Sequence, residues 1–261
     1  MTTWEAILLG IIQGLTEFLP ISSSGHLELG QYFLGFQDLQ NYIFFNLVCH
    51  LGTLVAIVYM FFPQLKQSLT QQTRFLQIFL GTLPLFPLVL ILKPLKAVFD
   101  QPQYLGICFL LSSALLFASS FSLRLTLSSD FSKRRWSDPL AIGLFQAVAV
   151  LPGVSRSGAT ISAARLLGWT KEEAIQFSFL LAIPAILGGT VLELWQIWKA
   201  PASDAAISFG QFFAGFSTSF IVGCAALWLL QRMMAQDKLI YFAWYCLGLG
   251  LFTSFYFNVL N

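Results

Sequence analysis

Long apolar runs, separated by short polar stretches, dominate the pattern of hydrophobic positions along this 261-residue chain. A helix that crosses a bilayer needs about 20 mostly apolar residues, because each residue adds only about 1.5 Å of length. Six stretches are long enough, and they lie at residues 43–62, 75–92, 104–126, 174–195, 209–230 and 240–257. The pattern therefore predicts an all-α polytopic membrane protein, with six full transmembrane helices in a single membrane domain at 1–261.

Two other apolar regions are too short to cross a bilayer and are interrupted by polar residues. Each consists of a short apolar segment, a tip rich in Gly, Ser and Pro, and a second short apolar segment. Backbone at membrane depth must be hydrogen-bonded, be buried in protein or line a water-filled cavity. We therefore expect two re-entrant helical hairpins, near 4–34 and 140–167, whose tips are enclosed by protein and form a site.

The two hairpins resemble each other in sequence. A Gly-x-x-Gln motif, a Leu-Pro pair and a Ser/Gly-rich tip follow in the same order in both, at an offset of 133 residues that slips to 132 at the Leu-Pro pair. This order indicates a duplication, with a first repeat at 1–126 and a second repeat at 138–261. Three crossings per half is an odd number, so the second repeat would be inverted and the two tips could meet near the membrane midplane.

The distribution of basic residues predicts an orientation. One side of the predicted membrane holds Lys66, Arg74, Arg124, Lys133, Arg134, Arg135, Lys171, Arg232 and Lys238, whereas the other holds Lys93, Lys96 and Lys199. The positive-inside bias places the first side in the cytoplasm and both termini on the outer, periplasmic side.

Composition agrees with a bilayer as the solvent. Of all residues 57% are hydrophobic and 10% are charged, whereas an ordinary soluble domain carries about a quarter charged residues. The net charge of +2 is too small to argue for nucleic acid as a partner.

An ionisable residue inside a membrane is a candidate functional residue, and Arg156 lies in the second tip. Its guanidinium is a planar fork of donors that suits phosphate oxygens. The residues around it would form a tight loop that opens a helix and directs N–H groups and hydroxyls at an anion; they are Gly153, Ser155, Ser157, Gly158 and Thr160. The alternative is that Arg156 only pairs with Glu17 and holds the hairpins together.

Glu17 in the first hairpin lies four residues after Gln13, so both side chains share one helix face. A bare carboxylate would repel a phosphate. Glu17 therefore makes sense beside one with a bridging divalent cation, or as a proton carrier. The alternative is a helix cap or a packing partner.

The first tip adds hydroxyls and an imidazole. Ser22, Ser23 and Ser24 could bind phosphate, attack it or satisfy the backbone of the turn, and spacing does not rank these uses. His26 follows them closely and is a candidate acid or base. His50 sits within an apparent crossing, and we expect it to be structural. Together these groups predict a phosphate-bearing lipid as the ligand.

Three segments resemble one known family, the bacterial undecaprenyl-diphosphate phosphatases, or bacitracin-resistance proteins. They are QGLTEFLPISSSGHL at 13–27, PGVSRSGAT at 152–160 and FSFLLAIP at 177–184. The resemblance implies an enzyme of the bacterial inner membrane that removes the terminal phosphate of undecaprenyl diphosphate. That reaction recycles the lipid carrier for peptidoglycan synthesis and confers bacitracin resistance. A divalent cation, Mg²⁺ or Ca²⁺, comes with it, and a homodimer is left open.

The resemblance also implies roles for single residues. Glu17 and His26 would act in catalysis, with Glu17 as metal ligand, Ser23 as candidate nucleophile and Arg156 on the diphosphate. The first motif of the family opens with Glu or Gln, and this chain has Gln13 there.

An inverted repeat fits a second class of function, a transporter or flippase for a polyprenyl phosphate. Architecture does not separate a transporter from an enzyme. A purely structural membrane subunit is disfavoured, because it gives no reason to place three ionisable residues at broken-helix tips.

Overall fold

The computed structural model describes residues 1–36, 42–88, 101–121, 134–199 and 207–260, and these residues are almost entirely helical, with no β-strand among them. Five helical segments are long and apolar enough to cross a membrane. They are α3 (Ile43–Met60), the 3₁₀ turn η2 (Pro102–Tyr104) with α7 (Leu105–Ser120), α10 (Lys171–Lys199), α11 (Phe209–Ala235), and α12 (Leu239–Phe255) running into η4 (Tyr256–Leu260). The all-helical fold class is confirmed.

The expected crossing at 75–92 is wrong as one continuous helix. The helix α5 (Gln72–Thr82) is followed by a turn at Leu83 and Pro84, and helix resumes only at Leu85. Proline has no N–H to donate, and its ring collides with the carbonyl one turn back, so Pro84 breaks the helix. The end of this crossing, 89–92, lies outside the described residues, as do 122–126 of the crossing expected at 104–126.

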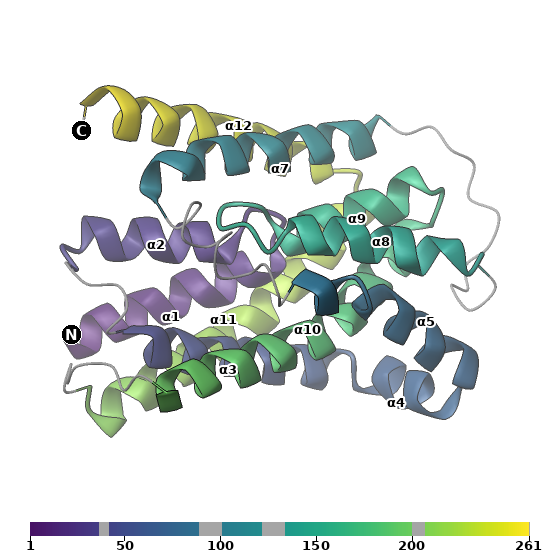
Figure 1. The fold of residues 1–261 in the computed structure, drawn as a ribbon, viewed down its shortest axis with the longest axis horizontal. Helices are drawn as coiled ribbons and strands as arrows, with labels where there is room; N and C mark the ends of the chain where they lie inside the picture. Colours follow the sequence, from purple (N-terminus) through teal and green to yellow (C-terminus); the bar gives the residue numbers. More distant parts are fainter. Residues whose placement is uncertain (37–41, 89–100, 122–133, 200–206, 261) are drawn as a thin grey trace.

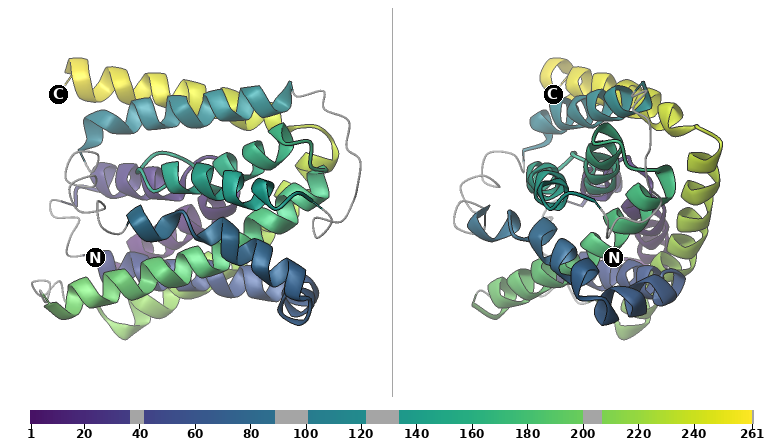
Figure 2. Two further views of the ribbon diagram at one scale, coloured as in Figure 1. Left: turned by 45° about the vertical axis from the view of Figure 1, so that its right-hand side comes forward. Right: turned by 90° about the vertical axis from the view of Figure 1, so that its right-hand side faces the viewer.

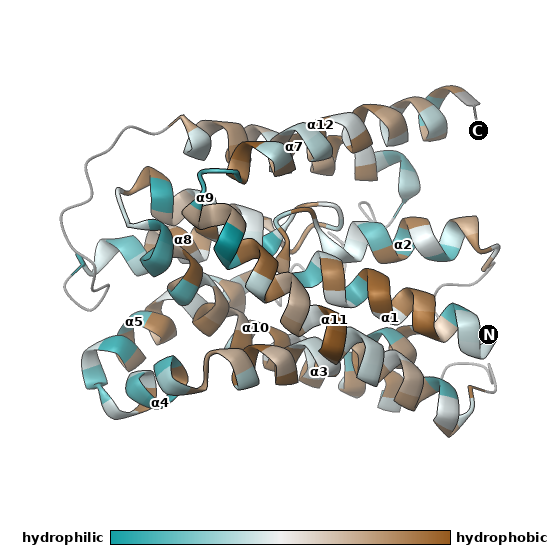
Figure 3. Ribbon diagram, turned by 180° about the vertical axis from the view of Figure 1, so that it is seen from behind, coloured by the Kyte–Doolittle hydropathy of each residue, from teal (hydrophilic) through white to brown (hydrophobic). Residues whose placement is uncertain are grey.

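Before that break the chain forms a pair of short helices. The helix α4 (Phe62–Thr70) follows directly on α3, and α5 turns back against it. Polar residues gather where α4 meets α5, at one end of the long axis, whereas apolar residues cover most of the long helices (Figure 3).

Four helices are too short to cross a bilayer, and they form two hairpins. These helices are α1 (Thr3–Phe18), α2 (Ser23–Phe33), α8 (Ser137–Val148) and α9 (Arg156–Leu166), with 16, 11, 12 and 11 residues. The α1–α2 hairpin starts from one end of the long axis and the α8–α9 hairpin from the other, and their turns meet near the middle (Figure 1). The long helices lie around both hairpins when the molecule is viewed along that axis (Figure 2).

The second helix of each hairpin ends in the same way. After α2 the backbone of Gly35 has φ +78°, and after α9 that of Gly168 has φ +85°. Glycine adopts this left-handed conformation without a steric cost. The N–H of the next residue, Phe36 or Trp169, then donates to a carbonyl near the helix end at 3.0 Å, which forms a Schellman cap in both hairpins.

The first helix of each hairpin packs closely against a helix of the other half. A Cβ atom added to Gly10 of α1 would lie 2.7 Å from the carbonyl oxygen of Gly215 in α11. A Cβ added to Gly143 of α8 would lie 2.2 Å from the carbonyl oxygen of Gly81 in α5. Both hairpins therefore depend on glycine, because only a residue without a side chain allows this backbone contact.

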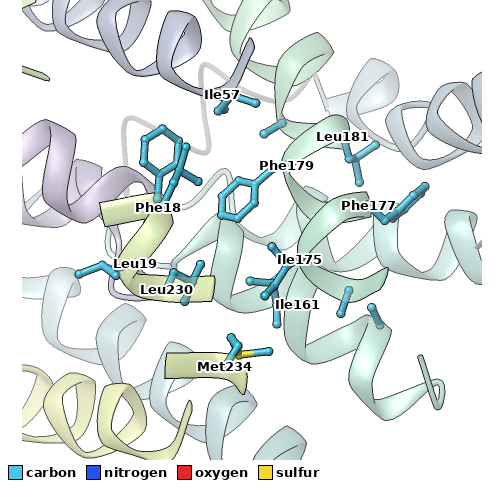
Figure 4. Close-up of a cluster of buried hydrophobic side chains, with 14 of the residues drawn as sticks. Phe18, Leu19, Ile57, Ile161, Ile175, Phe177, Phe179, Leu181, Leu230 and Met234 are labelled. Atoms are coloured by element: carbon cyan, nitrogen blue, oxygen red, sulfur yellow. The ribbon is translucent and has the colours of Figure 1, made fainter. Parts of the chain in front are cut away.

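The largest apolar core joins the two halves behind the hairpin turns (Figure 4). Phe18 from α1 meets Phe179 from α10 edge to face, with ring centroids 5.6 Å apart. The outer surface is also apolar, since exposed large side chains occur on each long helix. Examples are Tyr59, Ile107, Val191, Ile221 and Trp244. A continuous apolar exterior of this kind suits contact with lipid.

Candidate active site

A cavity of about 250 Å³ lies where the two hairpin turns meet, between α3 and α10. Its wall combines apolar side chains with polar ones from both halves of the chain. The polar residues are Thr16, Glu17, Ser22, Ser23, Ser24, His50, Gln146, Ser155, Arg156, Thr190 and Glu193. Six of the twelve residues expected at a site line this cavity; these are Glu17, Ser22, Ser23, Ser24, Ser155 and Arg156.

Glu17, near the end of α1, is the centre of the polar contacts. Its carboxylate accepts a hydrogen bond from the Ser23 hydroxyl at 2.6 Å and another from the Gln13 amide at 2.9 Å. Its other oxygen is paired with a terminal nitrogen of Arg156. Because Arg156 begins α9, this ion pair joins the turn of one hairpin to the turn of the other.

Arg156 therefore does pair with Glu17, as the structural alternative expected. The guanidinium also donates to the carbonyl of Ala182 at 3.2 Å. A guanidinium has five N–H donors, so N–H groups beyond those in these two contacts remain available for a ligand. Since the side chain also lines the cavity and is 19% exposed, it can bind an anion while it remains paired.

The first turn is held in a strained conformation. Ser22 has φ +73°, which is rare for a residue with a side chain and costs about 1–3 kcal/mol. This backbone starts α2 in a direction that brings the Ser23 hydroxyl to Glu17. A hydroxyl bonded to a carboxylate is the arrangement of a nucleophile beside a general base.

The second turn is stabilised by its own serines. The Ser155 hydroxyl accepts from the N–H of Gly158 at 3.1 Å and so caps α9. The hydroxyl of Ser157 donates to the carbonyl of Leu19 in the other hairpin, at 3.3 Å. Thr160 donates to the carbonyl of Arg156 at 2.9 Å. Ser157, Gly158 and Thr160 thus shape the turn and do not line the cavity.

Two glycines let the turns touch. A Cβ added to Gly25 would lie 3.1 Å from the Cα of Gly153, which itself has φ +90°. Gly153 is therefore a contact point between the hairpins, outside the cavity wall. Gln13 is also outside the wall, and it supports Glu17 from behind.

His26 points away from the cavity. Its Nδ1 lies 2.6 Å from the carbonyl of Ser22 and its Nε2 lies 2.8 Å from the hydroxyl of Tyr245. The imidazole also stacks on the Tyr245 ring, with centroids 5.7 Å apart. The structure therefore does not bring His26 to Glu17. His26 lies on the side of the α2 helix that faces α12.

The imidazole at Glu17 belongs to His50, which was expected to be structural. Its Nε2 lies 3.8 Å from the Glu17 carboxylate, and its Nδ1 lies 2.8 Å from the carbonyl of Asn46. A carbonyl only accepts, so Nδ1 carries a proton, and in the neutral form of the ring Nε2 has a lone pair at the cavity wall. This orientation suits a group that takes up a proton.

Besides His50, sequence reasoning missed four polar residues of the wall, Thr16, Gln146, Thr190 and Glu193. Glu193 is ionisable and lies within an expected crossing, so the criterion that marked Glu17 also applied to it. Gln146 is the repeat counterpart of Gln13 and was used only as evidence for the duplication, as part of the repeated Gly-x-x-Gln motif. Thr190 carries no signal in the sequence.

The donors in the cavity fit a divalent cation that is shared with a phosphate. Among the described residues no group of three or more His, Cys, Asp and Glu side chains could hold a metal by itself. The wall does offer the carboxylates of Glu17 and Glu193 and several hydroxyls. Mg²⁺ and Ca²⁺ prefer such oxygen donors, and Mg²⁺ commonly combines one or two carboxylates with substrate phosphates.

The fold and the cavity together define the class of protein. It is a helical protein with helices of membrane length and two hairpins of shorter helices, whose turns enclose a polar site with charged residues. The family model described as "Bacitracin resistance protein BacA" matches residues 6–252. The chain therefore belongs to the BacA family, which confirms the resemblance seen in the motifs.

Named relatives agree with this assignment. The undecaprenyl-diphosphatase of Protochlamydia amoebophila (strain UWE25) is 67% identical over 261 residues, covering 99% of this chain and 100% of the relative. The undecaprenyl-diphosphatase of Bacteroides fragilis (strain YCH46) is 35% identical over 263 residues, covering 97% of each chain. That of Alkaliphilus metalliredigens (strain QYMF) is 34% identical over 271 residues, covering 96% of this chain and 97% of the relative.

Proposed function

We propose that this protein is an undecaprenyl-diphosphatase, which hydrolyses undecaprenyl diphosphate to undecaprenyl phosphate and inorganic phosphate. The observation that carries the proposal is the contact of Ser23, Glu17 and Arg156 at the cavity between the hairpin turns. These groups are a hydroxyl, a base and an anion-binding cation. The names of the relatives supply the substrate.

The chain would work as a multi-pass protein of the bacterial inner membrane. The helix lengths, the apolar exterior and the two short hairpins support re-entrant hairpins that meet at the midplane. The matching glycine contacts and Schellman caps support an inverted repeat, since these two features of one half have counterparts in the other. Both termini would lie on the outer side.

The first chemical step would use the residues of the first turn. The Ser23 oxygen attacks the terminal phosphorus, and the Glu17 carboxylate takes the hydroxyl proton. The bond from this phosphorus to the bridging oxygen breaks, and undecaprenyl phosphate leaves with the electron pair. Arg156 stabilises the negative charge on the phosphoryl oxygens, which is the main requirement of phosphoryl transfer.

In the second step a water molecule attacks the phosphorus of the phosphoserine, the bond from phosphorus to the serine oxygen breaks, and Glu17 returns its proton to that oxygen, which releases inorganic phosphate and restores the serine hydroxyl. His50 Nε2 is placed to accept a proton from this water, since its lone pair faces the cavity beside Glu17. Direct attack of an activated water on the diphosphate is the alternative, and it differs by forming no phosphoserine. In both, a divalent cation held by Glu17 and Glu193 would neutralise charge on the diphosphate.

The product would return to the cell as the lipid carrier for peptidoglycan synthesis, and the same reaction would confer resistance to bacitracin. The apolar tail of the substrate would lie against lipid-facing helices, which explains why an enzyme with a polar reaction stays in the membrane.

The test is phosphate release from undecaprenyl diphosphate by the detergent-purified protein with Mg²⁺ or Ca²⁺. We expect release by the wild type, and almost none by Glu17→Ala or Arg156→Ala. Glu5→Ala is the control, because Glu5 only caps α1 at the surface. A polyprenyl-phosphate transporter would bind the lipid without releasing phosphate, and wild-type protein that behaves so would overturn the proposal.

A further inference from the structure

Two polar side chains in the cavity wall have no hydrogen-bond partner among the described residues. Gln146 on α8 is 2% exposed, and neither its amide nitrogen nor its amide oxygen is bonded within the part of the chain that the structure describes. The hydroxyl of Thr190 on α10 is also buried without a partner among those residues. Both residues line the cavity.

Such groups are costly for a folded protein. Buried polar atoms are almost always hydrogen-bonded. A buried polar atom without a partner destabilises the folded state, because it loses its hydrogen bonds to water and gains none within the protein. An apolar side chain of similar size would avoid this loss. The retention of Gln146 and Thr190 therefore points to a partner that comes from outside the chain.

The two halves of the cavity wall differ in this respect. Gln13, the repeat counterpart of Gln146, donates to Glu17 and so belongs to the reacting cluster of the first half. Gln146 makes no such contact, since the counterpart of Glu17 is missing from its hairpin and Val150, in the turn just after α8, occupies the equivalent position. The amide nitrogen of Gln13 is hydrogen-bonded although its amide oxygen is not, whereas neither polar atom of the Gln146 amide has a partner among the described residues.

The size of the cavity allows both walls to act on one ligand. A volume of about 250 Å³ holds several water-sized groups, where a single water needs only about 10–15 Å³ by this kind of measure. A diphosphate has two phosphoryl groups, and one of them must lie at Ser23 and Glu17 for the proposed reaction.

We propose that Gln146 and Thr190 bind the other phosphoryl group, the one that stays on the lipid. This inference rests on the proposed function. The amide N–H₂ and the hydroxyl donate to phosphoryl oxygens, which only accept. Both donors are neutral, so they orient this phosphate without competing with Arg156 for Glu17. Gln146 and Thr190 are thus substrate-positioning residues, and they would hold the lipid monophosphate as it leaves.

The test uses Gln146→Leu and Thr190→Val, which remove the donors and keep the side-chain size. Gln31→Leu and Thr253→Val are the controls, because these residues are equally buried and hydrogen-bonded but do not line the cavity. Affinity is measured for three probes, farnesyl monophosphate, farnesyl methylenediphosphonate and inorganic phosphate, and Tm is measured in detergent.

We expect Gln146→Leu to bind both farnesyl probes roughly tenfold to a hundredfold more weakly, because a hydrogen bond to a charged group is lost. Its affinity for inorganic phosphate, which occupies the site of the transferred group, should not change. Its Tm should be equal to or higher than that of the wild type, whereas Gln31→Leu should lower Tm and leave all affinities unchanged.

Three results would overturn the inference. Unchanged affinity for the farnesyl probes would mean that Gln146 and Thr190 bind only a water molecule and not the phosphate of the lipid. Equal weakening for inorganic phosphate would place Gln146 at the transferred group. A lowered Tm with normal binding would make Gln146 structural. A wild type that releases no phosphate from the diphosphate refutes the proposed reaction instead, so the two failures are distinguishable.

Discussion

At the scale of single residues, the site depends on one buried carboxylate with several partners. Glu17 is bonded to Ser23 and Gln13 from its own hairpin and to Arg156 from the other. Removing one member of a buried ion pair leaves the other charge without compensation. Variants of Glu17 or Arg156 therefore affect both chemistry and the contact between the hairpins, and conservative substitutions are the informative ones.

Replacing Arg156 with Lys keeps the charge and removes the planar fork. We expect kcat for phosphate release to fall roughly 100-fold, because a point charge cannot contact Glu17, the Ala182 carbonyl and a phosphoryl oxygen together. Steady-state phosphate release measures this. Arg165→Lys is the control, since Arg165 donates to the carbonyl of Trp169 outside the cavity. Near-normal turnover of Arg156→Lys would contradict the assigned role.

Ser23→Ala tests the nucleophile. We expect turnover to fall by roughly 100-fold or more if serine attacks, because the bonded pair with Glu17 is lost. The Ser68→Ala variant should turn over normally, because Ser68 is a buried serine of α4 outside the cavity wall and donates to the carbonyl of Gln64. Trapping of ³²P on the wild type but not on Ser23→Ala would identify the phosphoserine. Substantial turnover by Ser23→Ala would favour direct attack by water.

At the scale of elements, glycine contacts hold the hairpins against the long helices. Gly143 of α8 meets backbone atoms of Gly81 and the ring of Pro84, which cannot move aside as a flexible side chain could. The break of α5 at Pro84 therefore lies directly against the second hairpin. The interrupted helix is part of the packing that places Gln146 and Ala149 in the cavity wall.

Gly143→Ala should be destabilising by about 1–3 kcal/mol, since its methyl group would overlap the α5 backbone. The measurement is Tm of the purified protein in detergent. Gly188→Ala in α10 is the control, because nothing lies within 4 Å of an added Cβ there. Alanine also favours a helix over glycine by about 1 kcal/mol, so that control should be as stable as the wild type or more so. Equal Tm values for both variants would refute the tight contact.

At the scale of the whole molecule, the two ends of the long axis differ. The start of α1 and the end of η4 lie at one end, and the α4–α5 turn lies at the other (Figure 1). Basic side chains such as Lys66, Lys171 and Lys238 lie toward the second end, in and beside the turns there. The positive-inside bias therefore predicts that the α4–α5 turn lies in the cytoplasm.

Accessibility of introduced cysteines tests this orientation. Thr3→Cys should react with a membrane-impermeant maleimide in intact cells, whereas Gln71→Cys and Gln236→Cys should react only after permeabilisation. All three residues are exposed, so burial does not limit the reaction. The cysteine-free form of the chain under the same treatment is the control. The reverse labelling pattern would invert the predicted topology, and the first hairpin would then enter from the cytoplasm.

Hydropathy along the chain determined the fold class, five of the six expected crossings and the position of the two hairpin turns. These features are local, because a bilayer requires a minimum length of apolar helix and Gly, Pro and Ser interrupt it wherever they cluster. The sequence also determined the family, because residues 13–27 and 152–160 match the two motifs of that family. The ion pair of Glu17 with Arg156 was predicted as the alternative to anion binding by Arg156, because few other charged residues lie at the turns.

Only the tertiary structure decided which side chains face the cavity. His26 and His50 are both imidazoles near a turn, but the rotation of α2 turns one toward Tyr245 and that of α3 brings the other to Glu17. The contact of Gly143 with Gly81 places α8 so that Gln146 faces the cavity, and Glu193 on α10 reaches the same wall. Helix rotation and crossing depend on contacts between residues far apart in the sequence, and no local pattern in the sequence encodes them.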